Sequence, residues 1–168
     1  MALKTSWVAG NSPGFTWTQL FSSTAATDIN NASGIATGSC VMSTITISNQ
    51  TQLDTYMDLS ARFGISSSTI AAGANLAFYL YALLDDGTTY GSGELTAGTV
   101  ATTLPPMPPV AIIPLRAAAS QTALVGYQRA IIIPPGTFKM TFQNNCGFTT
   151  STTGNVCMYR TYNVNLNA

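Results

Sequence analysis

Hydrophobic and polar residues alternate in several short stretches of this chain, and a helical period hardly appears. The clearest stretch is YMDLSARFG at 56–64. Its four apolar side chains share one face and its polar ones the other, with Met57, Leu59, Ala61 and Phe63 facing Tyr56, Asp58, Ser60 and Arg62. The run LAFYLYALL at 76–84 is apolar on both faces, which is typical of a central strand that is covered on both sides. These patterns predict strands.

Further stretches with the same character follow along the chain: FTWTQLF at 15–21, CVMSTITI at 40–47, VAIIPL at 110–115, TALVGYQRAIII at 122–133, TFKMTFQNN at 137–145 and VCMYRTY at 156–162. About eight short strands separated by turn signals predict an all-β, antiparallel two-sheet sandwich. Eight strands in two packed sheets fit a jelly-roll-like fold. An immunoglobulin-like sandwich is the alternative, but its Cys-Trp-Cys pattern is missing.

Turn residues mark where strands end. In IIIPPGTFKMTFQNN at 131–145, two prolines stop the ladder and Gly136 allows the backbone to turn. We therefore expect a hairpin corner, with Thr137–Asn145 antiparallel to the strand before it. Asp86-Gly87 is a second turn signal. The proline-rich segment 98–109 predicts an exposed loop.

The domain organisation follows from where these patterns begin. Residues 15–168 are expected to form a single β-sandwich domain, and residues 1–14 an N-terminal arm that contains Trp7. Trp17 alternates with Phe15 and Phe21, so we expect it in the core.

Charge is scarce: only 7% of residues are charged and the formal net charge is zero. The lysines and arginines are isolated in sequence, so neither a nucleic acid nor an anionic membrane is an expected partner. A nearly uncharged surface has weak self-repulsion, which favours association with other proteins.

Groups that commonly perform catalysis are few. The chain has no histidine, and its three cysteines cannot supply a four-thiolate zinc site. Asp85 and Asp86 belong to a turn signal, and a pair of catalytic carboxylates, as in a glycosidase, is the less favoured interpretation. We therefore expect that the protein is not an enzyme and that it binds neither a cofactor nor a metal ion.

Cys40, Cys146 and Cys157 allow at most one internal disulfide, so we expect three core residues in a chain made in a reducing cytoplasm. The N-terminal MALKTSWVAG contains no apolar stretch of signal-peptide length, and the longest apolar run is about half a membrane span. The sequence therefore predicts no membrane insertion.

Four segments in order resemble a family of small virion proteins of tailed bacteriophages: MDLSARFG, FYLYALLDDGTTYGSGE, IIIPPGTFKMTFQNNCGF and TTGNVCMYRTYN. The resemblance covers about residues 57–163. It implies a jelly-roll protein on the virion, and most directly a capsid decoration (cement) protein that sits as a homotrimer on the lattice of the major capsid protein. The family offers no catalytic residues to carry over.

We therefore expect a structural protein on the capsid surface whose arm or loops bridge neighbouring subunits. The candidate contact residues are one aromatic residue in the arm and one proline-rich loop, namely Trp7, Pro105, Pro106, Met107, Pro108 and Pro109. A receptor- or glycan-binding module of a phage tail or fibre is the alternative.

Overall fold

The protein is described by a computed structural model that covers residues 4–9, 17–21, 28–30, 34–84, 88–91, 95–103, 105–116 and 118–167. Its strands are β1 (Lys4–Ala9), β2 (Thr18–Gln19), β3 (Cys40–Met42), β4 (Ile47–Asn49), β5 (Tyr56–Ile70), β6 (Asn75–Ala82), β7 (Val100–Ala101), β8 (Ala111–Pro114), β9 (Ala118–Ile132), β10 (Gly136–Asn145) and β11 (Val156–Asn167). A short 3₁₀ helix, η2, spans Asp28–Asn30.

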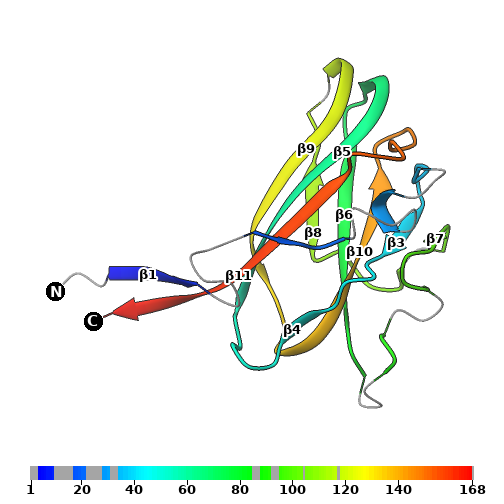
Figure 1. The fold of residues 1–168 in the computed structure, drawn as a ribbon. Coiled ribbons are helices and arrows are strands. Elements are labelled where there is room, and N and C mark those ends of the chain that lie inside the picture. Colours follow the sequence, from blue (N-terminus) through cyan, green and yellow to red (C-terminus); the bar gives the residue numbers. More distant parts are fainter. Residues whose placement is uncertain are drawn as a thin grey trace.

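The strands form two antiparallel sheets packed face to face (Figure 1). Sheet A has the order β1-β11-β5-β9, and β2 also pairs with β11. Sheet B has the order β7-β3-β10-β6-β8, and β4 also pairs with β10. The predicted all-β sandwich is therefore confirmed.

The strand pairs are nested along the chain. β2 pairs with β11, β3 and β4 pair with β10, β5 pairs with β9, and β6 pairs with β8. Successive pairs alternate between the two sheets, as when one long hairpin is wrapped around a barrel. This is the connectivity of a jelly roll.

The core between the sheets follows the predicted alternation. Met57, Leu59, Ala61 and Phe63 of β5 are buried, and so are Phe138, Met140 and Phe142 of β10. The rings of Phe63 and Phe142 stack across the two sheets with their centroids 4.3 Å apart. The three cysteines are buried and form no disulfide with one another, as expected of core residues.

A second apolar cluster lies on the outer face of sheet B. Cys40, Met42, Ala77, Tyr79, Tyr81 and Leu95 are buried in it, and Met107 packs against it. Strand β6 is consequently covered on both faces, which confirms that prediction. The prediction of an exposed loop over 98–109 is only partly right: Pro105 is buried, whereas Pro106 and Pro108 are exposed.

The Pro-Pro-Gly corner does not form the predicted hairpin. β9 lies in sheet A and β10 in sheet B, so the corner passes the chain between sheets. Gly136 has the positive φ (101°) that the turn requires. CVMSTITI is also not one strand, because the chain leaves the ladder after Ser43 and rejoins it at Ile47. The N–H of Ser43 still donates to the carbonyl oxygen of Met140 in β10 (2.8 Å), and its hydroxyl donates to the carbonyl oxygen of Leu20 (2.6 Å).

The two chain ends form an antiparallel ribbon. β1 pairs with the C-terminal half of β11, from Lys4 with Asn167 to Ala9 with Tyr162. β5 pairs with β11 only as far as Tyr162, so beyond this residue the ribbon extends away from the sandwich (Figure 1). We call β1 with Asn163–Asn167 the terminal ribbon.

Candidate functional site

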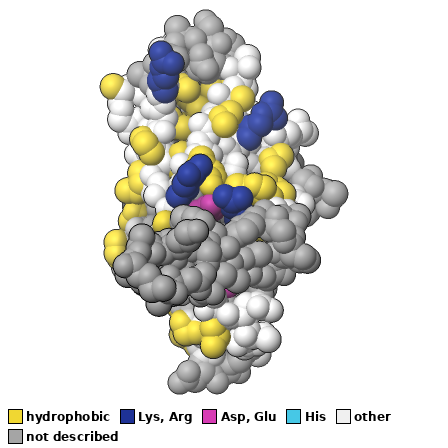
Figure 2. Space-filling view, turned by 90° about the vertical axis from the view of Figure 1, so that its left-hand side faces the viewer, with side chains coloured by type: hydrophobic (Ala, Val, Ile, Leu, Met, Phe, Trp, Pro, Cys, Tyr) yellow, Lys and Arg dark blue, Asp and Glu magenta, His cyan; other side chains and the backbone are white. Residues whose placement is uncertain are grey.

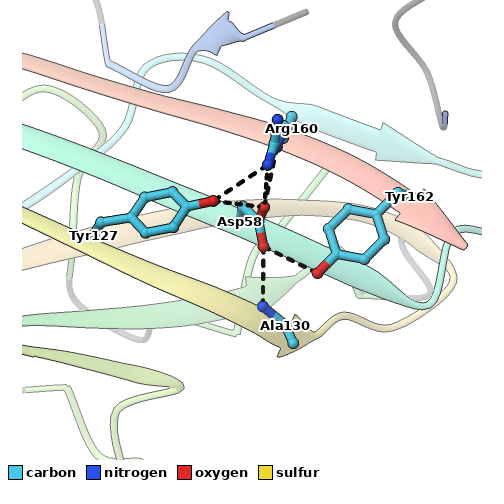
Figure 3. A network of polar contacts seen from close by, with 5 residues as sticks. All are labelled: Asp58, Tyr127, Ala130, Arg160 and Tyr162. Carbon is cyan, nitrogen blue, oxygen red and sulfur yellow. Dashed lines mark hydrogen bonds and ion pairs between the residues drawn. The ribbon is translucent and has the colours of Figure 1, made fainter. Parts of the chain in front are cut away.

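A buried carboxylate lies at the centre of the outer face of sheet A. Asp58 belongs to β5, where the core-facing neighbours Met57 and Leu59 leave its side chain on the opposite side of the sheet. Only 3% of Asp58 is exposed, because side chains from β9 and β11 close over it (Figure 3).

Both carboxylate oxygens of Asp58 accept hydrogen bonds. Oδ2 accepts from the Tyr127 hydroxyl (2.8 Å) and from Arg160 through Nε (3.0 Å) and Nη2 (2.8 Å). Oδ1 accepts from the Tyr162 hydroxyl (3.0 Å) and from the backbone N–H of Ala130 (3.0 Å). Five donors from two neighbouring strands therefore converge on one side chain (Figure 3).

A bulge in β9 supplies the backbone donor. The register passes from Met57 opposite Ile131 to Leu59 opposite Gln128, so two residues of β9 face Asp58 alone. Ala130, within this bulge, has a φ of 54°, in the left-handed region that L residues rarely adopt. The hydrogen bond from its N–H to Asp58 accompanies this strained conformation.

The surroundings perturb the pKa values of the network. Burial by itself would raise the pKa of Asp58, but the hydrogen bonds from Ala130, Arg160, Tyr127 and Tyr162 outweigh it, and the net pKa is lowered. Burial and the bond to the Asp58 carboxylate raise the pKa of Tyr162 to about 12. At neutral pH the carboxylate is therefore ionised and the phenol of Tyr162 protonated.

Aromatic rings surround this ion pair. The guanidinium of Arg160 lies 4.8 Å from the ring centroid of Trp17, and Trp17 meets Tyr127 edge to face at 5.7 Å. The guanidinium of Arg129 lies over the ring of Tyr127, 5.0 Å from its centroid. Tyr56 stacks on Tyr162 at 5.8 Å.

The predicted core position of Trp17 is wrong. Trp17 is half-buried on the outer face of sheet A, because the alternation breaks at Leu20 and Phe21, which are both fully buried. Gln19 pairs with Met158 of β11, and this register leaves Trp17 beside Arg160.

The chemistry of Asp58 is that of a structural ion. Its lone pairs are occupied by donors from its own fold, and its low pKa makes it a weak proton acceptor. The hydrogen bonds of Asp58 connect β5 to its two neighbouring strands, β9 and β11. Among the described residues, no group of three or more His, Cys, Asp or Glu side chains could hold a metal ion.

The structure places the predicted contact residues at separate parts of the fold. Trp7 lies in β1, where it is the register partner of Val164 in the terminal ribbon. The loop Pro105–Pro109 lies beside sheet B, with Met107 against the second cluster. The two candidates therefore belong to different surfaces.

Sequence reasoning missed the network around Asp58. It placed Asp58 on the polar face of its strand without a partner, and in the structure Asp58 forms an ion pair with Arg160. A signal was present in VCMYRTY, where Met158, Arg160 and Tyr162 share the face opposite the buried Cys157. The strand that lies beside β5 could not be known from the alternation alone.

The fold and site together define the class of the molecule as a jelly-roll sandwich with an aromatic and arginine-rich outer face on one sheet. No protein family, no curated protein and no solved structure matches this chain. The described residues include no helix that has the length and apolar character needed to span a membrane.

Proposed function

We propose that the protein is a structural component of a tailed-bacteriophage virion, a capsid decoration (cement) protein that self-associates as a homotrimer and binds the lattice of the major capsid protein. It performs no chemical step. The proposal rests on the sequence resemblance described above together with the fold and the terminal ribbon.

The terminal ribbon is the observation that carries this proposal. A two-stranded ribbon is marginally stable in water on its own. The two strands are far apart in sequence, and their pairing runs from Lys4 opposite Asn167 to Ala9 opposite Tyr162. The pairing of β11 with β5 ends at Tyr162, so most of the ribbon has no neighbouring strand of the sandwich beside it. Such an element gains stability when it contacts a neighbouring subunit.

Decoration acts by mass action. A protein that binds the assembled shell but not the free capsid subunits stabilises the shell. Three ribbons on a trimer reinforce one another through their effective concentration, so each contact can be weak. With 7% charged residues, these contacts depend mainly on apolar packing and backbone hydrogen bonds.

Deleting the residues before Ser12 tests the role of the ribbon. The deletion removes β1 and should lower occupancy on purified capsids about tenfold or more, since avidity multiplies the loss at each contact. The control is Thr152→Ala with Thr153→Ala, two exposed changes in the loop before β11, outside the candidate contact residues. Unchanged occupancy of the truncated protein would remove the ribbon from the mechanism.

A receptor- or glycan-binding module of a tail or fibre is the second candidate. The observation that favours it is the pair of rings Trp17 and Tyr127 on the outer face of sheet A, where Tyr127 is 37% exposed. Aromatic rings offer large amphipathic contact surfaces to ligands. A glycan array probed with wild-type protein and Tyr127→Ala separates this candidate from the first.

A further inference from the structure

The outer faces of the two sheets differ in how far the chain itself covers them. On sheet B, Leu95 and Met107 pack over the second cluster. On sheet A, large apolar side chains remain open to solvent: Ile132 is 72% exposed, Val125 68%, and Tyr127 and Val156 37% each. Sheet A therefore offers a surface of the kind that marks an interaction site.

These side chains lie on one face. Arg62 pairs with Val156 on one side and with Val125 on the other, so the three form a row across β11, β5 and β9. Tyr127 lies in the next row, opposite Ser60. We call Arg62, Val125, Tyr127, Arg129, Ile132 and Val156 the arginine face.

The charge on this surface has one sign. The three strands β5, β9 and β11 contain Arg62, Arg129 and Arg160 but only one acidic residue, Asp58, and no lysine or glutamate. The oxygens of Asp58 are occupied by donors of the protein itself, so Asp58 neutralises Arg160, and the part of the chain that the structure describes supplies no ion pair to Arg62 or Arg129. Figure 2 shows basic side chains among hydrophobic ones around a central acidic patch.

We propose that the arginine face binds an acidic surface of a different protein in the assembly. This inference rests on the proposed function, because it names the docking face and the charge of the partner. Arginine, tyrosine and other large side chains are enriched at protein interfaces, and complementary charge fixes their specificity. The apolar side chains of the face supply contact area, and Arg62 and Arg129 select carboxylates.

A second copy of the same face does not fit. A two-fold contact between identical faces would bring arginines near arginines, and juxtaposed like charges disfavour association. Nucleic acid fits poorly, since Arg62 and Arg129 alone neutralise too few phosphates for strong binding. An acidic protein surface satisfies both the charge and the apolar area.

Charge reversal tests the face directly. Arg62→Glu with Arg129→Glu should weaken binding to purified virion capsids about tenfold or more, with the wild-type affinity falling as salt rises. Lys139→Glu on sheet B is the matched control and should change binding by less than about twofold, since it alters charge away from the face. Circular dichroism and thermal unfolding of each variant show that the fold is retained.

Photo-crosslinking makes the test independent of the capsid assignment. Benzoylphenylalanine replaces Val125 in the full chain, which is made in cells that produce the whole assembly. The control carries it at Ile112, a half-exposed residue of β8. Crosslinks from Val125, mapped by mass spectrometry, should fall on an Asp- or Glu-rich surface of one other protein. Changing those acids to arginine should restore binding to the doubly reversed variant.

The outcomes separate the two proposals. If wild-type protein fails to bind capsids but Val125 crosslinks to an acidic protein surface elsewhere, the capsid role is wrong and the face stands. If capsids bind wild type and the reversed variant equally, the face is wrong and the capsid role stands. Crosslinks to a second copy or to a glycan, or no crosslink, overturn the inference.

Discussion

Arg160 and Asp58 form an ion pair across two hydrogen-bonded strands, with Nη2 2.8 Å from Oδ2, although 102 residues separate them in sequence. Arg160 on β11 lies directly opposite Asp58 on β5. The first and last long strands of the jelly roll in sheet A are thereby joined beside the point where the terminal ribbon leaves the sandwich.

Replacing Asp58 with asparagine should destabilise the protein at pH 7. One buried acceptor is lost while its donors remain, so we expect the free energy of unfolding to fall by about 2–3 kcal/mol. Because the pKa of Asp58 is lower in the folded state, its ionised form stabilises the fold above about pH 4, the ordinary value, and this contribution disappears as the pH falls further.

The stability gap between wild type and Asp58→Asn should therefore narrow on acidification. Urea unfolding of both proteins at pH 7, 4 and 2.5 measures it. A gap of constant size over this range would mean that the charge of Asp58 contributes nothing to the fold.

The elements around this pair show how far sequence reasoning reaches. Period-2 alternation depends only on which face of a strand is buried, so the core faces of β5 and β10 could be predicted. Pairing depends on contacts between distant residues. The alternation therefore could not show that Arg160 lies opposite Asp58, nor that the corner at Gly136 crosses between sheets rather than forming a hairpin.

The structure also departs in two places from what the alternation of apolar and polar residues predicts. The chain bends after Ser43, whose hydroxyl accepts from the N–H of Ile45 (2.9 Å), and this bend interrupts a stretch that reads as one strand. Leu20 and Phe21 are both buried, which breaks the phase that placed Trp17 in the core. The capsid assignment, in contrast, depends on resemblance and stays a prediction.

Replacing Ala130 with glycine should stabilise the protein. A φ of 54° costs an L residue about 1–2 kcal/mol, whereas glycine loses about 0.5–1 kcal/mol more chain entropy on folding. We expect a net gain of about 0.5–1 kcal/mol in the free energy of unfolding, measured by chemical denaturation. Ala61→Gly, in the regular part of β5, is the control and should lower stability. A loss for Ala130→Gly would show that its backbone is not strained.

Replacing Gly126 with alanine should crowd the core. A Cβ at this position would lie 1.9 Å from Cγ2 of Ile113, which is buried between the sheets. We expect a cost of about 1–3 kcal/mol, the range for overpacking.

The same contact can be tested by a double-mutant cycle. Ile113→Ala alone opens a cavity and should cost about 2–5 kcal/mol. Combined with Gly126→Ala, it removes the clash, and the new methyl group fills part of the space. The double variant should be more stable than the sum of the single changes by about 1 kcal/mol or more, and additive effects would place the clash elsewhere.

Replacing Tyr81 with phenylalanine should leave stability unchanged or raise it by about 1 kcal/mol. The Tyr81 hydroxyl is buried in the second cluster without a hydrogen-bond partner among the described residues, and an unsatisfied buried polar group costs about 1–3 kcal/mol. Burial also raises the pKa of this phenol to about 12.

Tyr79→Phe is the matched control, because both residues lie on β6 in the same cluster. The Tyr79 hydroxyl donates to Oε1 of Gln143 at 2.6 Å, so its removal leaves this buried acceptor with only the longer bond from Nδ2 of Asn145 (3.3 Å) and should cost about 1–2 kcal/mol. Both variants lose one hydroxyl oxygen. Tyr79→Phe should lower the urea midpoint, whereas Tyr81→Phe should leave the midpoint unchanged or raise it. Equal losses would mean that the Tyr81 hydroxyl is hydrogen-bonded in solution, and that the covering of sheet B is more open to water than its packing indicates.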